Sequence, residues 1–148
     1  MELYSVVNGV KKNLEDVNDE AFSQKMLGDG VAIIPHDGQI VAPIDSEVTM
    51  LFPTCHAIGL KTQEGLEILI HIGIDTVEMN GDGFEASVKQ GDKVKQGQVL
   101  IQFDLTKIKK LGYEPDTMVI MTNSKQYSSL KITSLNDLTI HDLLLEIE

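Results

Sequence analysis

Short apolar or alternating runs, separated by Gly, Asp and Pro about every eight to twelve residues, are the feature that most limits the fold of this chain. No stretch is long enough, with a helical period, to supply a bundle of helices. Regularly spaced short strands are typical of antiparallel sheets that pack face to face or close into a barrel. We therefore predict an all-β fold, an antiparallel β-sandwich or barrel of the barrel-sandwich type, with short helical turns.

The individual elements follow from the same pattern. Strands are predicted at 31–35, 39–44, 47–53, 56–62, 67–74, 84–88, 98–104, 117–123 and 130–134. Helical segments are predicted at 19–26, after the polar "DVND", and at 105–111, before Gly112. Because no linker or low-complexity segment interrupts the chain, we expect residues 1–148 to form one domain.

Charge and cysteine content exclude several classes of protein. The formal net charge is -11 and the twelve basic residues are dispersed, which argues against a nucleic-acid partner. Cys55 is the one cysteine, so no intrachain disulfide can form, and we expect it to be a small core residue. No signal segment and no apolar run of about 18 residues is present, so we expect a cytoplasmic protein that does not insert into a membrane.

Two histidines lie in predicted neighbouring strands. His71 stands in the apolar run "LIHIGIDTV", and His56 follows Thr54 by two residues in "PTCHAIGL", which puts Thr54 and His56 on one face of a strand. If 56–62 and 67–74 pair across the turn "QEG", opposite residues have numbers that sum to about 128, so His56 and His71 can meet after a shift of one. Two imidazoles in apolar surroundings suggest metal ligation, acid–base work or nucleophilic attack.

Several motifs together resemble a known family. They are "AFSQKMLGDGVAIIP", "IVAPI", "FPTCHAIGL", "EILIHIGIDTVEMNGDGF", "GDKVKQGQVLIQFD" and "MVIMTNS". In this combination and over nearly the whole chain they resemble the glucose-type enzyme IIA domain of the bacterial phosphoenolpyruvate-dependent sugar phosphotransferase system. The resemblance implies a phosphotransferase component without a cofactor. It would accept a phosphoryl group from the phosphocarrier protein HPr, hold it as phosphohistidine, and pass it to a sugar-specific IIB domain. It would associate with the membrane only through the IIBC transporter.

The resemblance also implies roles for single residues. His71 would carry the phosphoryl group, His56 would steady it, and Thr54 would hydrogen-bond to His56. A carbonyl near Gly73 is the expected acceptor for the second ring nitrogen of His71. An exposed acidic and apolar collar would dock the partners; it comprises Asp19, Phe22, Met26, Leu27, Phe52, Leu69, Asp75 and Val77.

Three points stay open at the level of sequence. Asp75 could serve docking or backbone support, or its carboxylate could cap the turn at "DTV". Ser46 stands where the family usually has glycine, which would cause strain only at positive φ. The chain could be a free-standing IIA protein or a domain excised from a fused transporter.

Two other classes of function compete with this interpretation. His56, His71 and Asp75 could form a two-histidine, one-carboxylate metal site in a small hydrolase, although the chain has no HExxH-like pair. The predicted hairpins also resemble those of biotinyl and lipoyl carrier domains. Because no "MKM"-like tripeptide is present, we attribute that likeness to shared architecture.

Overall fold

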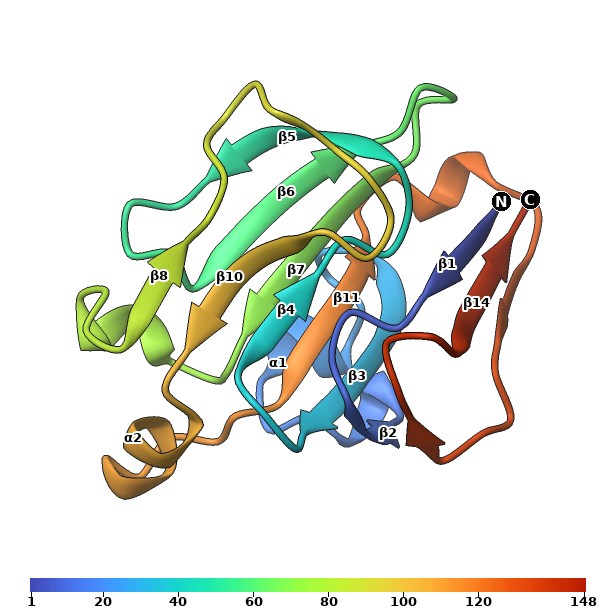
Figure 1. Cartoon of the computed structure of the whole chain (residues 1–148). Helices are drawn as coiled ribbons and strands as arrows, with labels where there is room; N and C mark the ends of the chain where they lie inside the picture. The colour runs from blue at the N-terminus through green and yellow to red at the C-terminus, as the bar shows by residue number, and fades with distance from the viewer.

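Three antiparallel sheets form the fold in the computed structural model, which describes residues 1–148 (Figure 1). The largest sheet has the strand order β13 (Asp137–Leu138), β2 (Gly9–Lys12), β3 (Asp29–Pro35), β11 (Thr117–Met121), β7 (Glu67–Ile72), β6 (Ala57–Lys61), β5 (Ser46–Leu51) and β9 (Lys93–Val94). The second has the order β4 (Gln39–Val41), β10 (Val99–Phe103) and β8 (Phe84–Ala86), and the third β1 (Glu2–Tyr4), β14 (Leu143–Ile147) and β12 (Leu130–Ile132). The predicted sandwich is confirmed, and the sheets do not close into a barrel.

The helical segments are all short. They are η1 (Leu14–Asp16), α1 (Glu20–Ser23), η2 (Thr76–Met79), α2 (Leu105–Lys110) and η3 (Ser124–Gln126). The segment predicted as a helix at 19–26 has only four helical residues, because Lys25 adopts a positive φ of 57° and ends the helical path. None of these helices has the length and apolar character needed to span a bilayer.

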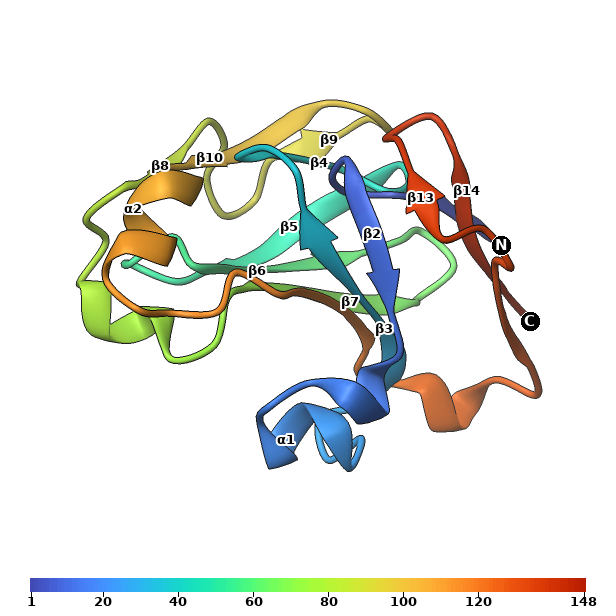
Figure 2. The same ribbon diagram turned by 90° about the horizontal axis from the view of Figure 1, so that it is seen from below.

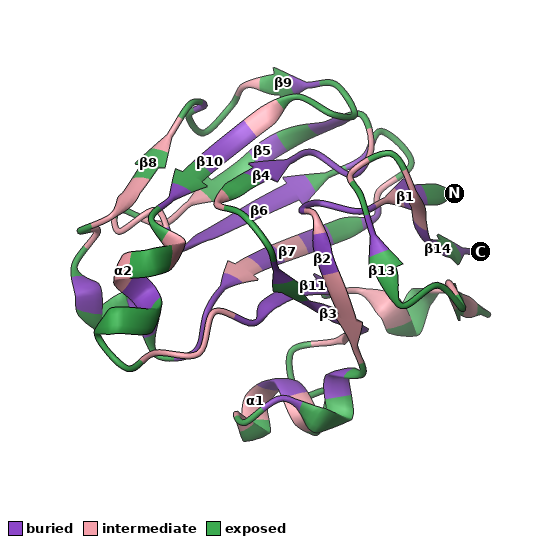
Figure 3. Ribbon diagram, turned by 60° about the horizontal axis from the view of Figure 1, so that its bottom comes forward, coloured by how far each residue is buried: buried purple, intermediate pink, exposed green.

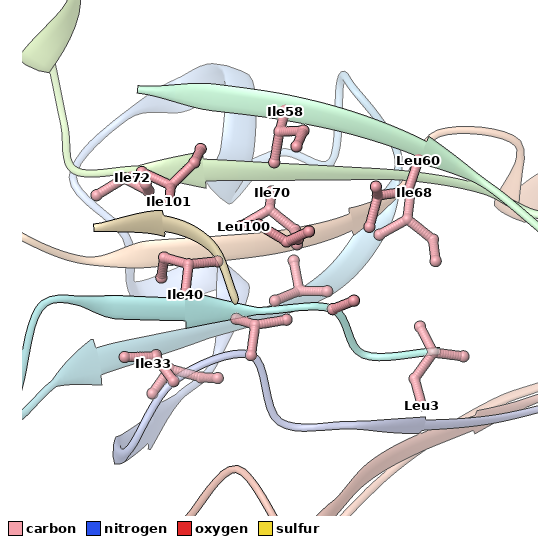
Figure 4. Close-up of a cluster of buried hydrophobic side chains, with 14 of the residues drawn as sticks. Leu3, Ile33, Ile40, Ile58, Leu60, Ile68, Ile70, Ile72, Leu100 and Ile101 are labelled. Atoms are coloured by element: carbon pink, nitrogen blue, oxygen red, sulfur yellow. The ribbon is translucent and has the colours of Figure 1, made fainter. Parts of the chain in front are cut away.

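The main core lies between the largest sheet and the β4–β10–β8 sheet (Figure 4). Ile68, Ile70 and Ile72 of β7 point into this core, where the opposite sheet contributes Ile40 and Leu100. Side chains alternate along a strand, so the residues between them on β7 point to the other face of the sheet. Leu69 and His71 are these residues, and both are partly exposed.

The other face of the largest sheet is covered in part by α1 and η1. Figure 2 shows α1 on the side of this sheet away from β4 and β10. A second apolar cluster lies under it and comprises Leu14, Val17, Phe22, Ala32, Ile74, Met118 and Ile120. In Figure 3 the strands β6 and β11 are mostly buried, whereas α1 and α2 combine buried, intermediate and exposed residues. We call this face of the largest sheet, which α1 and η1 cover only in part, the half-covered face. It is the candidate location for a functional site.

The predicted hairpin of β6 and β7 is confirmed, including its register. Ala57 lies opposite His71 and Ile58 lies opposite Ile70, so that paired numbers sum to 128. The turn closes between Thr62 and Leu66, as the amide of Thr62 donates to the carbonyl of Leu66 over 3.0 Å. His56 immediately precedes β6, and its carbonyl accepts from Ile72.

Each predicted strand is present, although most are shorter than predicted. Residues 42–44, for example, were expected to continue the strand that ends at Val41. Strands β1, β2, β9, β13 and β14 lie outside the predicted set. Of these, β1 pairs with β14 and brings the two ends of the chain side by side (Figure 1). Ser46 has no positive φ and its hydroxyl donates to the carbonyl of Ile44, so this position is unstrained.

Candidate functional site

Two histidines and two phenylalanines form a continuous row of rings on the half-covered face. The ring centroids of His56 and His71 are 5.0 Å apart, with the planes nearly perpendicular at 86°. Phe22 packs 5.0 Å from His71 at the α1 side, and Phe52 packs 5.2 Å from His56 at the other side. The predicted meeting of the two histidines is therefore confirmed.

The strands supply a rigid base for His71. Met118 of β11 and Ala57 of β6 lie directly opposite His71 on its two sides, and both are buried. Central strands of a sheet with hydrogen bonds along both edges are among the least mobile parts of a protein. The position of the His71 backbone is thus fixed from both directions.

One ring nitrogen of His71 is held by the backbone. Its Nδ1 lies 3.0 Å from the carbonyl oxygen of Gly73. A carbonyl oxygen can only accept, so Nδ1 carries the proton, and Nε2 keeps a free lone pair. Gly73 has a φ of 78°, and a Cβ there would approach the carbonyl oxygen of Glu114 to 3.1 Å and Thr76 even more closely. Glycine is required for the turn that presents this carbonyl.

The ring of His56 is held by Thr54. Thr54 Oγ1 and His56 Nδ1 are 2.5 Å apart. A hydroxyl can donate to Nδ1, which leaves a proton on Nε2 of His56 for donation to a bound anion. The contact arises from a turn in which the Cys55 amide donates to the Phe52 carbonyl and Cys55 itself has a φ of 57°. The predicted contact is present, although Thr54 precedes the strand on which it was expected.

Cys55 corrects one prediction from sequence. Its side chain is partly exposed, and Sγ lies 3.9 Å from the carbonyl oxygen of Pro53. Cys55 is therefore a turn residue and not a small residue of the core.

Both histidines are neutral at physiological pH. Burial, together with the nearby His56, lowers the pKa of His71 to about 4, although the Gly73 carbonyl and the Asp19 carboxylate oppose the shift. Burial also lowers the pKa of His56 below its ordinary value. A neutral imidazole with a free Nε2 lone pair can act as a nucleophile.

We expect the pH dependence of stability to report this shift. An unfolded histidine has a pKa of about 6.5, so between pH 6.5 and 4 the unfolded chain binds more protons at this position than the folded chain. The contribution of neutral His71 to the free energy of unfolding is therefore complete above pH 6.5 and is lost as the pH falls to about 4. An NMR titration of the His71 ring should give a midpoint near 4, whereas a midpoint of 6.5 or above would contradict this electrostatic description.

The predicted docking collar is only partly exposed. Met26, Leu27, Asp75 and Val77 are exposed; Asp19, Phe52 and Leu69 are partly buried. The Asp19 carboxylate also accepts from the Ala21 amide and caps α1. The side chain of Asp75 makes no capping hydrogen bond, which contradicts the turn-capping alternative for this residue.

Phe22 is the member of this set that the structure corrects. Its side chain is only 3% exposed and packs in the second apolar cluster against neighbours such as Ile74 and Met118. Phe22 therefore lies beneath the collar and supports the ring of His71, instead of offering an apolar side chain to a partner.

The burial of Phe22 makes Phe22→Ser a test of the core instead of the docking surface. Replacing a buried phenylalanine with a small polar residue leaves a cavity and should lower the free energy of unfolding by about 3–5 kcal/mol. Urea unfolding of the variant and the parent chain measures the difference. Met26→Ser, at an exposed neighbouring position, is the matched control and should change the midpoint little. Equal midpoints for Phe22→Ser and the parent chain would show that Phe22 is not a core residue.

Sequence reasoning missed Met50, which lies on the same face as His71. Met50 is exposed and stands opposite Gly59, which in turn stands opposite Leu69. A bulge between Val48 and Met50 shifts the alternation of β5. Strict alternation along the sequence therefore could not assign Met50 to this face.

The metal-hydrolase alternative lacks its ligand set. No three His, Cys, Asp or Glu side chains gather where they could hold one metal ion, and Asp75 does not complete a site with the two histidines. This geometry does not support the alternative built on His56, His71 and Asp75.

Comparison with known proteins gives a consistent result. Residues 1–127 match a family model described as phosphoenolpyruvate-dependent sugar phosphotransferase system, EIIA 1. The chain is 50% identical over 124 residues to a PTS system glucose-specific EIIA component of Halalkalibacterium halodurans, covering 84% of this chain and 72% of the relative. It is 45% identical over 146 residues to a PTS system beta-glucoside-specific EIIBCA component of the same organism, where it covers 99% of this chain and spans only 23% of the relative.

A solved structure matches the fold equally well. Glucose permease IIA from Mycoplasma capricolum superposes with a TM-score of 0.89 at 35% identity, covering 98% of this chain and 94% of the other. The superposition therefore covers nearly the whole chain.

Proposed function

This chain belongs to the EIIA 1 family of the phosphoenolpyruvate-dependent sugar phosphotransferase system, and from that premise we propose that His71 carries the phosphoryl group between HPr and a IIB domain. The family makes the chain a phosphocarrier component of this system. The observation that supports His71 as the carrier is the hydrogen bond from its Nδ1 to the Gly73 carbonyl, which leaves Nε2 unprotonated beside His56.

Transfer of the phosphoryl group to His71 needs no external base. The Nε2 lone pair forms the bond to phosphorus as the bond between phosphorus and the donor breaks, and the PO₃ group moves in line between the two. No proton has to leave His71, because the ring proton stays on Nδ1 and bonds to the Gly73 carbonyl. Onward transfer to the acceptor is the same step in reverse, with the acceptor as nucleophile.

His56 and Thr54 stabilise the charge in this scheme. The Nε2–H of His56 donates to an oxygen of the phosphoryl group, whose charge spreads over three equatorial oxygens in the transition state. Thr54 holds Nδ1 of His56 and so keeps the proton on Nε2. His56 is only 3% exposed, so water competes weakly for this donor.

Partners dock on the exposed collar in this proposal. Met26, Leu27 and Val77 offer apolar surface, and Phe52 and Leu69 extend it toward the two rings. Asp19 and Asp75 add negative charge, which favours basic groups on HPr and on the IIB domain. Phe22 supports this surface from below.

Val77→Ser tests the docking surface. The variant should raise the KM for phosphorylated HPr about threefold to tenfold with little change in Tm, because an apolar anchor is lost from the interface and not from the core. Leu135→Ser is the matched control, since Val77 is 49% exposed and Leu135, before β13, is 48% exposed. Phosphorylation time courses at several HPr concentrations give both values. An unchanged KM, or an equal rise in the Leu135 variant, would exclude Val77 from the interface.

The acceptor is a sugar-specific IIB domain in this proposal. The names of the two relatives described above contain glucose and beta-glucoside, and the two match this chain at similar identity. The comparisons therefore do not favour one of these sugars. The name of the second relative joins EIIA to B and C components, which is consistent with transfer to a IIB domain.

Phosphorylation in vitro tests the proposed function. The chain is incubated with phosphoenolpyruvate, enzyme I and HPr, and its intact mass is measured under mildly alkaline conditions. We expect one added phosphoryl group, which peptide mapping assigns to His71. An unchanged mass, or a label on His36 or His141, would contradict the proposal.

A further inference from the structure

A largely buried ion pair lies next to the turn that orients His71. Lys12 Nζ is 2.8 Å from Asp116 Oδ2, and the side chains are 23% and 5% exposed. A carboxylate this deeply buried is costly unless it is paired. Of the ion pairs in the molecule, this is the one with an almost fully buried partner, and neither residue has a role in the phosphoryl-transfer scheme.

Backbone hydrogen bonds connect Asp116 to the turn of His71. The amide of Gly73 donates to the carbonyl of Asp116 over 2.8 Å, and the amide of Ile74 donates to the carbonyl of Glu114 over 2.9 Å. The carbonyl of the same Gly73 accepts from His71 Nδ1 at 3.0 Å. A short chain of contacts thus runs from Lys12 through Asp116 and Gly73 to the His71 ring.

Lys12 is too far away to touch a phosphoryl group on His71. The two residues lie on the same face in one cross-strand row, in which Lys12 pairs with Ala32, Ala32 with Met118, and Met118 with His71. Figure 1 shows β2, β3, β11 and β7 side by side. Three strand spacings amount to about 14 Å. Lys12 therefore has no direct contact with the reacting group, and Asp116 provides a path of contacts between Lys12 and the His71 turn.

We propose that the Lys12–Asp116 ion pair is a positioning device that keeps the Gly73 carbonyl aimed at His71 Nδ1 and thereby keeps Nε2 free for attack. The ion pair fixes the segment of Glu114 and Asp116 whose carbonyls hold the Gly73–Ile74 turn. The importance of this device for phosphoryl transfer rests on the proposed function, but its effect on the His71 ring does not.

The physical reason lies in the tautomers of neutral histidine. The proton of a neutral imidazole resides on either nitrogen, and the hydrogen bond at one nitrogen selects the form. If the Gly73 carbonyl turns away, the tautomer with the proton on Nε2 becomes populated. That form has no lone pair at Nε2 and cannot accept phosphorus there, so the rate falls with the population of the correct tautomer.

The test compares variants that distinguish two effects: the cost of burying Asp116 without a partner, and the loss of the contacts that position the Gly73 carbonyl. Lys12→Met leaves Asp116 buried without a partner and should destabilise the fold. Lys12→Met combined with Asp116→Asn removes the unpaired charge and should recover most of the stability. Lys12→Arg retains an ion pair and should behave like the parent chain. Lys107→Met is the matched control, because it breaks a 2.7 Å pair with Asp82 that makes no hydrogen bond to the His71 turn.

Nitrogen-15 NMR of the His71 ring is the deciding readout. In the double variant the Nε2 resonance should move toward the protonated position, and phosphorylation by HPr should slow roughly tenfold, which corresponds to about 1.4 kcal/mol. The parent chain, Lys12→Arg and Lys107→Met should show a single tautomer with the proton on Nδ1. Unchanged His71 resonances in the folded double variant, or the same change in Lys107→Met, would overturn the proposal. Absence of phosphorylation in the parent chain would instead contradict the proposed function, and the NMR comparison would still test the positioning.

Discussion

His71→Gln should abolish phosphorylation by HPr. The amide nitrogen of glutamine has its lone pair delocalised into the carbonyl and cannot hold a labile phosphoryl group, whereas Nε2 of His71 presents a free lone pair. Intact mass after incubation with phosphoenolpyruvate, enzyme I and HPr should equal the unmodified value. The expected loss is complete and exceeds every other effect described above.

Folding must be shown to survive this substitution. His71 is partly exposed and glutamine is of similar size, so Tm should change by only a few degrees. His36→Gln provides the matched control at an exposed histidine and should accept phosphoryl normally. Phosphorylation of a folded His71→Gln chain would show that another residue is the carrier.

His56→Gln should produce a different defect. Glutamine can still donate a hydrogen bond from its amide, so the variant should accept a phosphoryl group from HPr, but it should transfer the group onward about a hundredfold more slowly. The loss of one well-placed donor in the transition state costs on the order of 2–3 kcal/mol. Time courses of acceptance from HPr and of donation to a IIB domain measure the two steps separately.

Thr54→Val provides the control for this second effect. Valine preserves the shape of threonine but cannot hold His56 Nδ1, so it should slow onward transfer in the parent chain and add little in the His56→Gln background. If His56→Gln and His71→Gln lose acceptance alike while both remain folded, the proposed division of roles between the two histidines is wrong.

The parts of the site that could be predicted depend on residues close together in the sequence. The alternation of β7 and the turn signal at Gln63 to Gly65 made a register possible in which His56 and His71 can meet, without fixing that register. The structure has paired numbers that sum to 128, and the two rings are in contact. The Gly73 carbonyl was also predictable, because a glycine two residues after a strand histidine allows a tight turn back to the ring.

Other features depend on contacts between distant segments. The burial of Phe22 could not be predicted from the sequence, because it requires Met118 and Ile74 to pack against α1. The left-handed conformation of Cys55 arises within a loop whose residue types do not demand it. Lys12 and Asp116 are 104 residues apart, and they meet only because β2, β3 and β11 are neighbours in the sheet.

The most direct test of the central proposal is to identify the nitrogen that is phosphorylated. The chain is labelled with nitrogen-15 at histidine, phosphorylated through HPr, and examined by phosphorus and nitrogen NMR under mildly alkaline conditions. We predict a bond from phosphorus to Nε2 of His71, with Nδ1 still protonated and bonded to the Gly73 carbonyl. A phosphoryl group on Nδ1 of His71, or on His56, would contradict the proposal that Gly73 fixes His71 for attack through Nε2.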